Sequence, residues 1–144
     1  MKGNLSVAPS RVKLWISTCA SSAGGPLKPG FGLSGEVHTS QAPLYTCWPV
    51  ITEAAWLLRH STRAVRQLLN SVDGGFLELL PLAGKDAQGI AATMKKYESM
   101  RPQVADAALV YLAGREKIET VFTLDRRDFS VYRASGRRAL RIVP

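Results

Sequence analysis

Three acidic residues stand where the hydrophobic pattern of the chain does not call for them: Glu53, Asp106 and Asp125. Asp106 is the most informative, because every other residue from 104 to 110 is valine, alanine or leucine. An ionised carboxylate buried in such surroundings costs several kcal/mol unless a cation compensates its charge. Asp106 therefore indicates cation binding, and the cation is either a bound ion or an arginine, since the chain has 19 lysines and arginines.

The other two acids have structural explanations as well as functional ones. Glu53 falls near the start of an expected helix, where the helix dipole and the free amides of the first turn favour a carboxylate. Asp125 follows an expected strand and opens the sequence Asp-Arg-Arg-Asp, which is an ordinary turn composition. Position alone leaves the role of both residues open.

The elements that must position these acids follow a regular pattern from residue 43 onward. Apolar residues recur at helical spacing over 50–69 and 86–100, and residues 104–113 are apolar nearly all round, as in a buried helix. Short β-branched or apolar runs predict strands at 44–47, 76–80, 120–124 and 139–143. Strands that alternate with helices indicate an α/β fold, with a mostly parallel central sheet flanked by helices. Ligands of such folds bind at the carboxyl ends of the strands, where Asp125 is expected.

Residues 1–43 differ in composition from the rest of the chain. They are rich in glycine and proline, hold Glu36 as their single acid, and show no periodic pattern after a possible strand at 11–16. We therefore expect one domain made of an irregular N-terminal segment, 1–43, with one possible strand, and a regular part, 44–144.

Three segments, taken in order, resemble the second, third and fourth acidic motifs of PIN-domain proteins, the family of the VapC-like toxin ribonucleases. They are 48–58, 104–110 and 122–129, with the sequences Trp-Pro-Val-Ile-Thr-Glu-Ala-Ala-Trp-Leu-Leu, Val-Ala-Asp-Ala-Ala-Leu-Val and Phe-Thr-Leu-Asp-Arg-Arg-Asp-Phe. The resemblance extends over residues 43–144 and implies a PIN-like fold for that part.

The resemblance also implies a metal site. Glu53, Asp106 and Asp125 would meet at the carboxyl edge of the sheet and hold one or two Mg²⁺ or Mn²⁺ ions, because hard cations prefer oxygen ligands. A bound metal would activate water for in-line attack on an RNA phosphodiester. Asp128 would be an accessory acid, and Thr123 would either orient a water or carboxylate or be an ordinary strand residue.

One expected acid is missing from the chain. Family members carry an acid at the end of the opening strand, where this sequence has Ser17, 36 residues ahead of Glu53. A hydroxyl cannot supply the missing negative charge, so three acids in place of four should lower metal affinity. The resemblance therefore implies either a working ribonuclease or a catalytically impaired module that still binds RNA or an antitoxin.

The charge of the chain favours a polyanionic partner. The net charge is +8, from 19 lysines and arginines against 11 acids, and neutralised phosphates release their counterions. A group of arginines near the C-terminus could follow an RNA backbone, pair with an acidic antitoxin tail, or form a solvated basic face. These are Arg126, Arg127, Arg133, Arg137, Arg138 and Arg141.

The remaining features bear on partners and compartment. Trp48, Trp56 and Tyr111 occupy apolar helical positions, so we expect them in the core or in dimer contacts rather than stacked on bases, and the resemblance implies a homodimer. No apolar run approaches the roughly 20 residues that span a bilayer. Cys19 and Cys47 show no paired or metal-ligand spacing. We expect a cytoplasmic protein with no membrane partner.

These observations lead to one main hypothesis and two alternatives. The main hypothesis is a Mg²⁺-dependent endoribonuclease of a toxin–antitoxin pair, with RNA as substrate and a cognate antitoxin as partner. The first alternative is the impaired PIN-like module without the first metal-binding acid. A small basic nucleic-acid-binding protein with no active site is the second, and it leaves the buried Asp106 unexplained.

Overall fold

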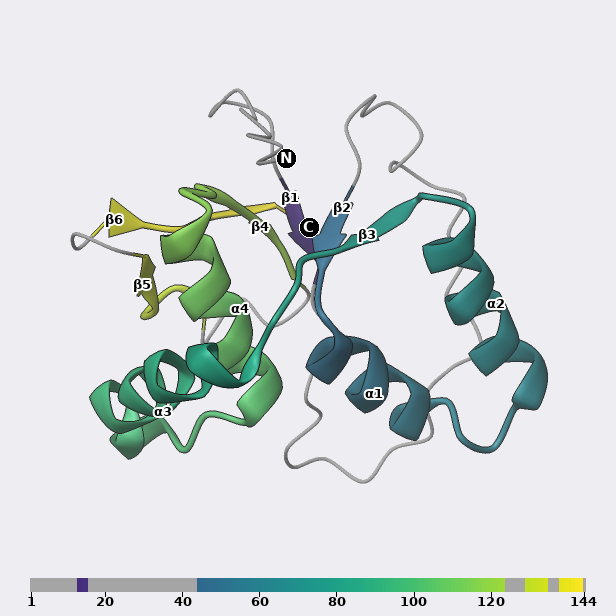
Figure 1. Ribbon diagram of the computed structural model, residues 1–144, viewed down its shortest axis with the longest axis horizontal. Helices are drawn as coiled ribbons and strands as arrows, with labels where there is room; N and C mark the ends of the chain where they lie inside the picture. Colours follow the sequence, from purple (N-terminus) through teal and green to yellow (C-terminus); the bar gives the residue numbers. More distant parts are fainter. Residues whose placement is uncertain (1–12, 16–43, 124–128, 135–137, 144) are drawn as a thin grey trace.

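The centre of the fold is a five-stranded parallel sheet. The computed structural model describes residues 13–15, 44–123, 129–134 and 138–143. Within them the strands lie in the order β3-β2-β1-β4-β7, and every neighbouring pair is parallel. The strands are β1 Lys13–Trp15, β2 Leu44–Thr46, β3 Leu77–Leu79, β4 Thr120–Phe122 and β7 Arg141–Val143 (Figure 1). The predicted α/β class with a mostly parallel sheet is confirmed.

The strands predicted at 11–16, 44–47, 76–80 and 120–124 are all present, each reduced to three residues. β1 lies between β2 and β4, although it comes from the segment 1–43. The glycine- and proline-rich remainder of that segment lies outside the described residues.

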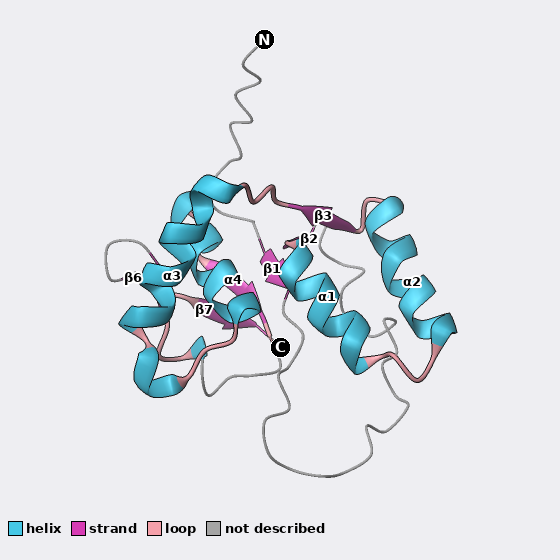
Figure 2. Ribbon diagram, turned by 60° about the horizontal axis from the view of Figure 1, so that its bottom comes forward, coloured by secondary structure: helices cyan, strands magenta, loops and turns pink. Residues whose placement is uncertain are grey.

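Helices make the crossovers that parallel strands require. α1 (Trp48–Leu57) and α2 (Thr62–Asp73) connect β2 to β3, and α3 (Ala87–Lys96) and α4 (Val104–Arg115) connect β3 to β4. The short 3₁₀ helices η2 (Gly84–Asp86) and η3 (Glu98–Met100) flank α3. In Figure 1 the α1–α2 pair lies on the right and the α3–α4 pair on the left, and Figure 2 shows α1 and α4 side by side.

The single helix predicted over 50–69 is wrong, because the structure has two helices there. α1 ends at Leu57, and α2 begins after Ser61. The Ser61 hydroxyl accepts a hydrogen bond from the backbone N–H of Ala64 at 3.3 Å. Such N-capping satisfies one of the free amides of a first helical turn, so it favours a new helix start in the middle of a continuous apolar stripe.

α4 is the buried helix that the sequence predicts. Residues 105–110, 112 and 113 are all buried, and the helix packs against both α3 and α1. It also contacts β5, so neighbours cover most of its surface, and the partly exposed residues of 105–115 are Tyr111, Gly114 and Arg115. The apolar composition of 104–113 follows from that burial.

The contact between α3 and α4 depends on a glycine. Gly89 of α3 faces the ring of Tyr111 on α4, and a Cβ added at Gly89 would overlap that ring. The ring cannot simply swing away, since the Tyr111 hydroxyl is held by a hydrogen bond to the carboxylate of Asp86 at 2.8 Å. The absence of a side chain at Gly89 therefore allows the two helices to lie this close.

The C-terminal part differs from its prediction in detail. The single strand expected at 139–143 is divided into β6 (Arg138–Ala139), which pairs antiparallel with β5 (Arg133–Ala134), and β7, which pairs parallel with β4. Buried Leu140 separates the two. None of the helices in the described ranges is long and apolar enough to cross a membrane.

Replacing Gly89 with alanine should destabilise the fold. Overpacking a closely packed contact costs about 1–3 kcal/mol, and we expect a loss of that size for Gly89→Ala in the free energy of unfolding measured in urea. Gly84→Ala is the matched control, because a Cβ at Gly84 meets no atom within 4 Å. Equal stability of the two variants would contradict the proposed role of Gly89.

Candidate metal site at the carboxyl edge of the sheet

Asp106 lies in the first turn of α4 and is 8% exposed. Its Oδ2 accepts a hydrogen bond from the backbone N–H of Gln103 at 3.2 Å. This contact satisfies an amide at the helix start, and the positive end of the helix dipole favours the carboxylate there. The bond also fixes the orientation of the Asp106 side chain, which is what a positioned ligand requires.

Glu53 lies in the second turn of α1 and is half-buried. α1 starts directly after β2, with Cys47 between them, so the beginning of α1 lies at the carboxyl end of β2. α4 runs back to the start of β4 through residues 116–119, so its own beginning lies at the same edge of the sheet. α1 and α4 also pack together, as Figure 2 shows, so the topology places the starts of both helices at the same edge of the sheet.

Of the other predicted site residues, the structure describes only Thr123. Asp125, Asp128 and Ser17 lie outside the described residues. Thr123 is described, follows the last residue of β4 and is completely buried. The convergence of Glu53, Asp106 and Asp125 therefore stays a prediction, while Thr123 is a buried polar residue at the expected edge.

A second buried threonine at this edge was not predicted. Thr46 is the last residue of β2 and is 0% exposed. Its Oγ1 has no hydrogen-bond partner among the described residues. An unpaired buried hydroxyl is costly and uncommon, so it marks a place where a water or a ligand can complete the bonding. β2 and β4 both pair with the central strand β1. Thr46 and Thr123 therefore lie at the carboxyl ends of its two neighbouring strands.

The oxygen donors at this edge are of the type that Mg²⁺ or Mn²⁺ takes. Two carboxylates, Glu53 and Asp106, come from the described residues, in which no group of three His, Cys, Asp or Glu side chains is placed to hold a metal. Cys47 lies between β2 and α1, and burial raises the pKa of its thiol to about 11, against a smaller lowering by the backbone N–H of Val50. At neutral pH that thiol is protonated, so it offers neither a soft metal ligand nor a nucleophile.

A separate polar cluster, missed in the sequence, lies between η2 and α4. Asp86 is 4% exposed, and its Oδ1 accepts hydrogen bonds from the Tyr111 hydroxyl at 2.8 Å and from Arg115 Nη1 at 3.2 Å. Its Oδ2 accepts from the Ala83 amide at 2.7 Å. The two side-chain partners, Tyr111 and Arg115, are 25 and 29 residues away in the sequence, so no local pattern pointed to this cluster.

The same contacts change the acidity of the cluster. The pKa of Asp86 is lowered, chiefly by the Ala83 amide and then by the Tyr111 hydroxyl and by Arg115, against the opposing effect of burial. The pKa of Tyr111 is raised, first by its hydrogen bond to Asp86 and then by burial. The cluster holds an ionised carboxylate that ties α4 to the segment before α3.

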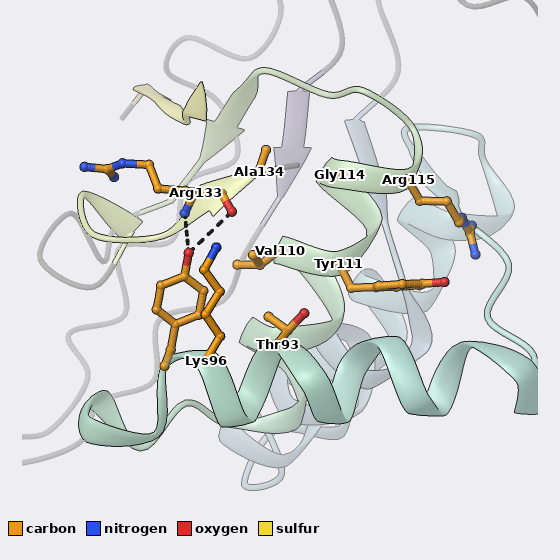
Figure 3. Close-up of a pocket in the computed structure, with 9 residues that line it drawn as sticks. Thr93, Lys96, Val110, Tyr111, Gly114, Arg115, Arg133 and Ala134 are labelled. Carbon is orange, nitrogen blue, oxygen red and sulfur yellow. Dashed lines mark hydrogen bonds between the residues drawn. The ribbon is translucent and has the colours of Figure 1, made fainter. Parts of the chain in front are cut away.

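The hollow drawn in Figure 3 is distinct from the carboxyl edge. It has a volume of about 390 Å³ and is lined by residues of α3, α4 and β5. Arg115 on its rim is paired with Asp86 and Glu116. Arg133 donates through Nη1 to the carbonyls of Ser130 and Tyr132. Gly114 in its wall lies about 12 Å along α4 from Asp106, given about 1.5 Å of rise per residue.

The aromatic and basic residues singled out in the sequence are distributed differently from the expectation. A core position is wrong for Trp48 and Trp56, which are 57% and 64% exposed, whereas Tyr111 is half-buried. The dimer contacts stay a prediction. Of the C-terminal arginines, Arg126, Arg127 and Arg137 lie outside the described residues, and Arg141 is exposed.

A parallel α/β sheet, with acids on two helices that start at its carboxyl edge, is the arrangement expected of the PIN-domain class. No protein-family model matches the chain. The chain is, however, 34% identical over 97 residues to Ribonuclease VapC26 of Mycobacterium tuberculosis (strain ATCC 25618 / H37Rv), a match that covers 66% of this chain and 72% of that protein. The chain belongs to the VapC-like family of PIN-domain proteins.

Asp86→Asn should alter the pH dependence of stability. Because folding lowers the pKa of Asp86, its contribution is complete above the ordinary value of 3.8 and is lost as the pH falls through the lower, folded value. We expect Asp86→Asn to be less stable than the unaltered protein at pH 7, with a difference that shrinks below pH 3.8. Urea denaturation at a series of pH values measures it.

Tyr111→Phe is the companion variant, since it removes one donor and leaves the carboxylate. Its loss of stability at pH 7 should be smaller than that of Asp86→Asn. A difference between Asp86→Asn and the unaltered protein that stays constant down to pH 2 would show that the charge of Asp86 is not what stabilises the fold.

Proposed function

We propose that this protein is a metal-dependent endoribonuclease of a toxin–antitoxin pair, in which Glu53, Asp106 and Asp125 hold Mg²⁺ or Mn²⁺ and RNA is the substrate. The observation that supports this most directly is Asp106, a buried and oriented carboxylate on the helix that packs against the helix of Glu53. The relative that is 34% identical is named a ribonuclease, which agrees with this reaction class.

The proposal gives a defined task to four described residues: Gln103, Asp106, Thr46 and Thr123. The Gln103 amide holds the Asp106 carboxylate at the start of α4, where the positive end of the helix dipole interacts favourably with a negative charge. The hydroxyls of Thr46 and Thr123 offer donors and acceptors to a water or to a carboxylate at the same edge. When bound, the metal would activate a water and offset charge on the leaving oxygen of the phosphodiester.

The second candidate function is an impaired module that binds RNA or an antitoxin without cutting. It is favoured by Ser17, which stands two residues after the end of β1, where the family has an acid. The loss of one carboxylate lowers the negative charge that draws a divalent cation. The two candidates differ in whether the remaining acids still bind metal.

The proposed partners follow from the same assignment. A cognate antitoxin would neutralise the toxin, a second copy would form a homodimer, and the protein would act in the cytoplasm. The net charge of +8 suits RNA and also suits an acidic antitoxin segment.

The deciding experiment compares RNA cleavage with Mg²⁺, with Mn²⁺ and with EDTA. Asp106→Asn keeps an oxygen that can accept the Gln103 amide and removes only the charge. We expect it to lower the affinity for Mn²⁺, measured by calorimetry, and the cleavage rate by at least about 100-fold, because loss of groups that merely support a ligand already costs about 10–100-fold. Asp73→Asn, the same change at an exposed acid of α2, should behave as the unaltered protein.

The second candidate is tested in the same assay by Ser17→Asp. If the unaltered chain binds Mn²⁺ weakly and only Ser17→Asp cuts RNA, the impaired module is the correct assignment. Cleavage by the unaltered chain that persists both in EDTA and in Asp106→Asn would rule out the metal mechanism.

A further inference from the structure

The outer face of α1 exposes two tryptophans to water. Trp48 and Trp56 are 57% and 64% exposed, and Trp56 has the larger exposed fraction of the two. They are eight residues apart, about 2.2 helical turns, so they lie about 12 Å apart along α1 and about 80° apart around its axis. Large exposed aromatic side chains mark a surface that binds something flat or apolar.

Trp56 is also next to a proposed metal ligand. It follows Glu53 by three residues, and residues three apart on a helix are neighbours on its surface. On the surface of α1 the indole is therefore a neighbour of Glu53. RNA bound at Glu53 would lie within reach of Trp56.

An arginine is stacked on Trp56. The guanidinium carbon of Arg59 lies 4.3 Å from the centroid of the Trp56 ring, and Arg59 Nη1 donates to the Trp56 carbonyl oxygen at 2.9 Å. This cation–π contact fixes a positive charge beside the exposed ring. In α2, the next helix along the chain, Arg63 and Arg66 are also exposed.

The charge of this surface selects its partner. Residues 54–72 contain three arginines, Arg59, Arg63 and Arg66, and no acid. An uncharged apolar partner would leave these cations without counter-charges. Unpaired nucleotides match both features, because every base has a flat face for an indole and every phosphate a charge for an arginine.

We propose that Trp48 and Trp56 of α1, with Arg59 in the turn after that helix, form a stacking platform for single-stranded RNA. This inference rests on the proposed function and adds to it a binding surface outside the candidate metal site. Bases of a duplex are stacked on each other, whereas splayed bases of loops and single strands reach aromatic side chains. The platform therefore admits single strands and disfavours duplexes.

The test measures RNA binding without cleavage. The full chain is titrated in EDTA into a fluorescently labelled 12-nucleotide RNA of mixed sequence, and separately into its duplex with the complementary strand, with anisotropy as the readout. The unaltered protein should prefer the single strand. Trp56→Ala should weaken single-strand binding by about 5- to 100-fold and leave duplex binding nearly unchanged, given the size of base–aromatic stacking.

Three further variants separate stacking from charge and from folding. Trp56→Phe keeps a ring and should lose less affinity than Trp56→Ala. Arg63→Gln should weaken single-strand and duplex binding alike and lower the salt dependence by about one counterion. Phe76→Ala removes another exposed aromatic side chain, 37% exposed before β3, and should leave binding unchanged.

The outcomes distinguish this inference from the proposed ribonuclease. Single-strand binding that depends on Trp56, in a protein that never cuts RNA, supports the platform and overturns the enzyme. Cleavage combined with unchanged single-strand binding in both Trp48→Ala and Trp56→Ala overturns the platform alone. If Trp48→Ala or Trp56→Ala changes the oligomeric state measured by light scattering and leaves the RNA affinity unaltered, this face binds a second copy. That outcome also overturns the platform.

Discussion

The rest of the structure depends on the burial of α4. A helix that is apolar nearly all round must be covered, and here α1, α3 and β5 pack against it. That packing fixes the position of every group attached to the helix. Asp106 at its start is carried to the carboxyl edge of the sheet, and Tyr111 and Arg115 near its end are carried to Asp86. One packed helix thus positions both polar centres of the molecule.

The two polar centres solve the problem of a buried charge differently. Asp86 is surrounded by an amide, a hydroxyl and a guanidinium, and its role is to hold α4 against the segment before α3. Asp106 stands at the start of α4 and accepts the Gln103 amide, at the edge where α/β folds bind ligands. The first carboxylate is surrounded by partners within the protein, and the second is the one that the proposed function assigns to a cation.

The sequence predicted those features that repeat along the chain. The strands of the parallel sheet and the buried helix at 104–113 followed from runs and periodicity, which are properties of short segments. The break between α1 and α2 did not, because one hydroxyl, that of Ser61, decides it. Asp86 was also missed, since its partners are 25 and 29 residues away. The tryptophans of α1 were expected in the core or in dimer contacts, and the core position is wrong because periodicity reports residue type, whereas exposure depends on what the fold leaves uncovered. Of the predicted site, Glu53 and Asp106 are described, and the convergence with Asp125 remains a prediction.

The order of the strands has a consequence for how the protein is made. β1, the first strand synthesised, ends up in the middle of the sheet, and its neighbour β4 is more than 100 residues later in the chain. Contacts of such long range form slowly, because the chain must lose the entropy of closing a long loop before the contacts contribute favourable free energy. On the ribosome, one side of β1 therefore stays unpaired until β4 has been synthesised. The carboxyl edge between these two strands is completed only then.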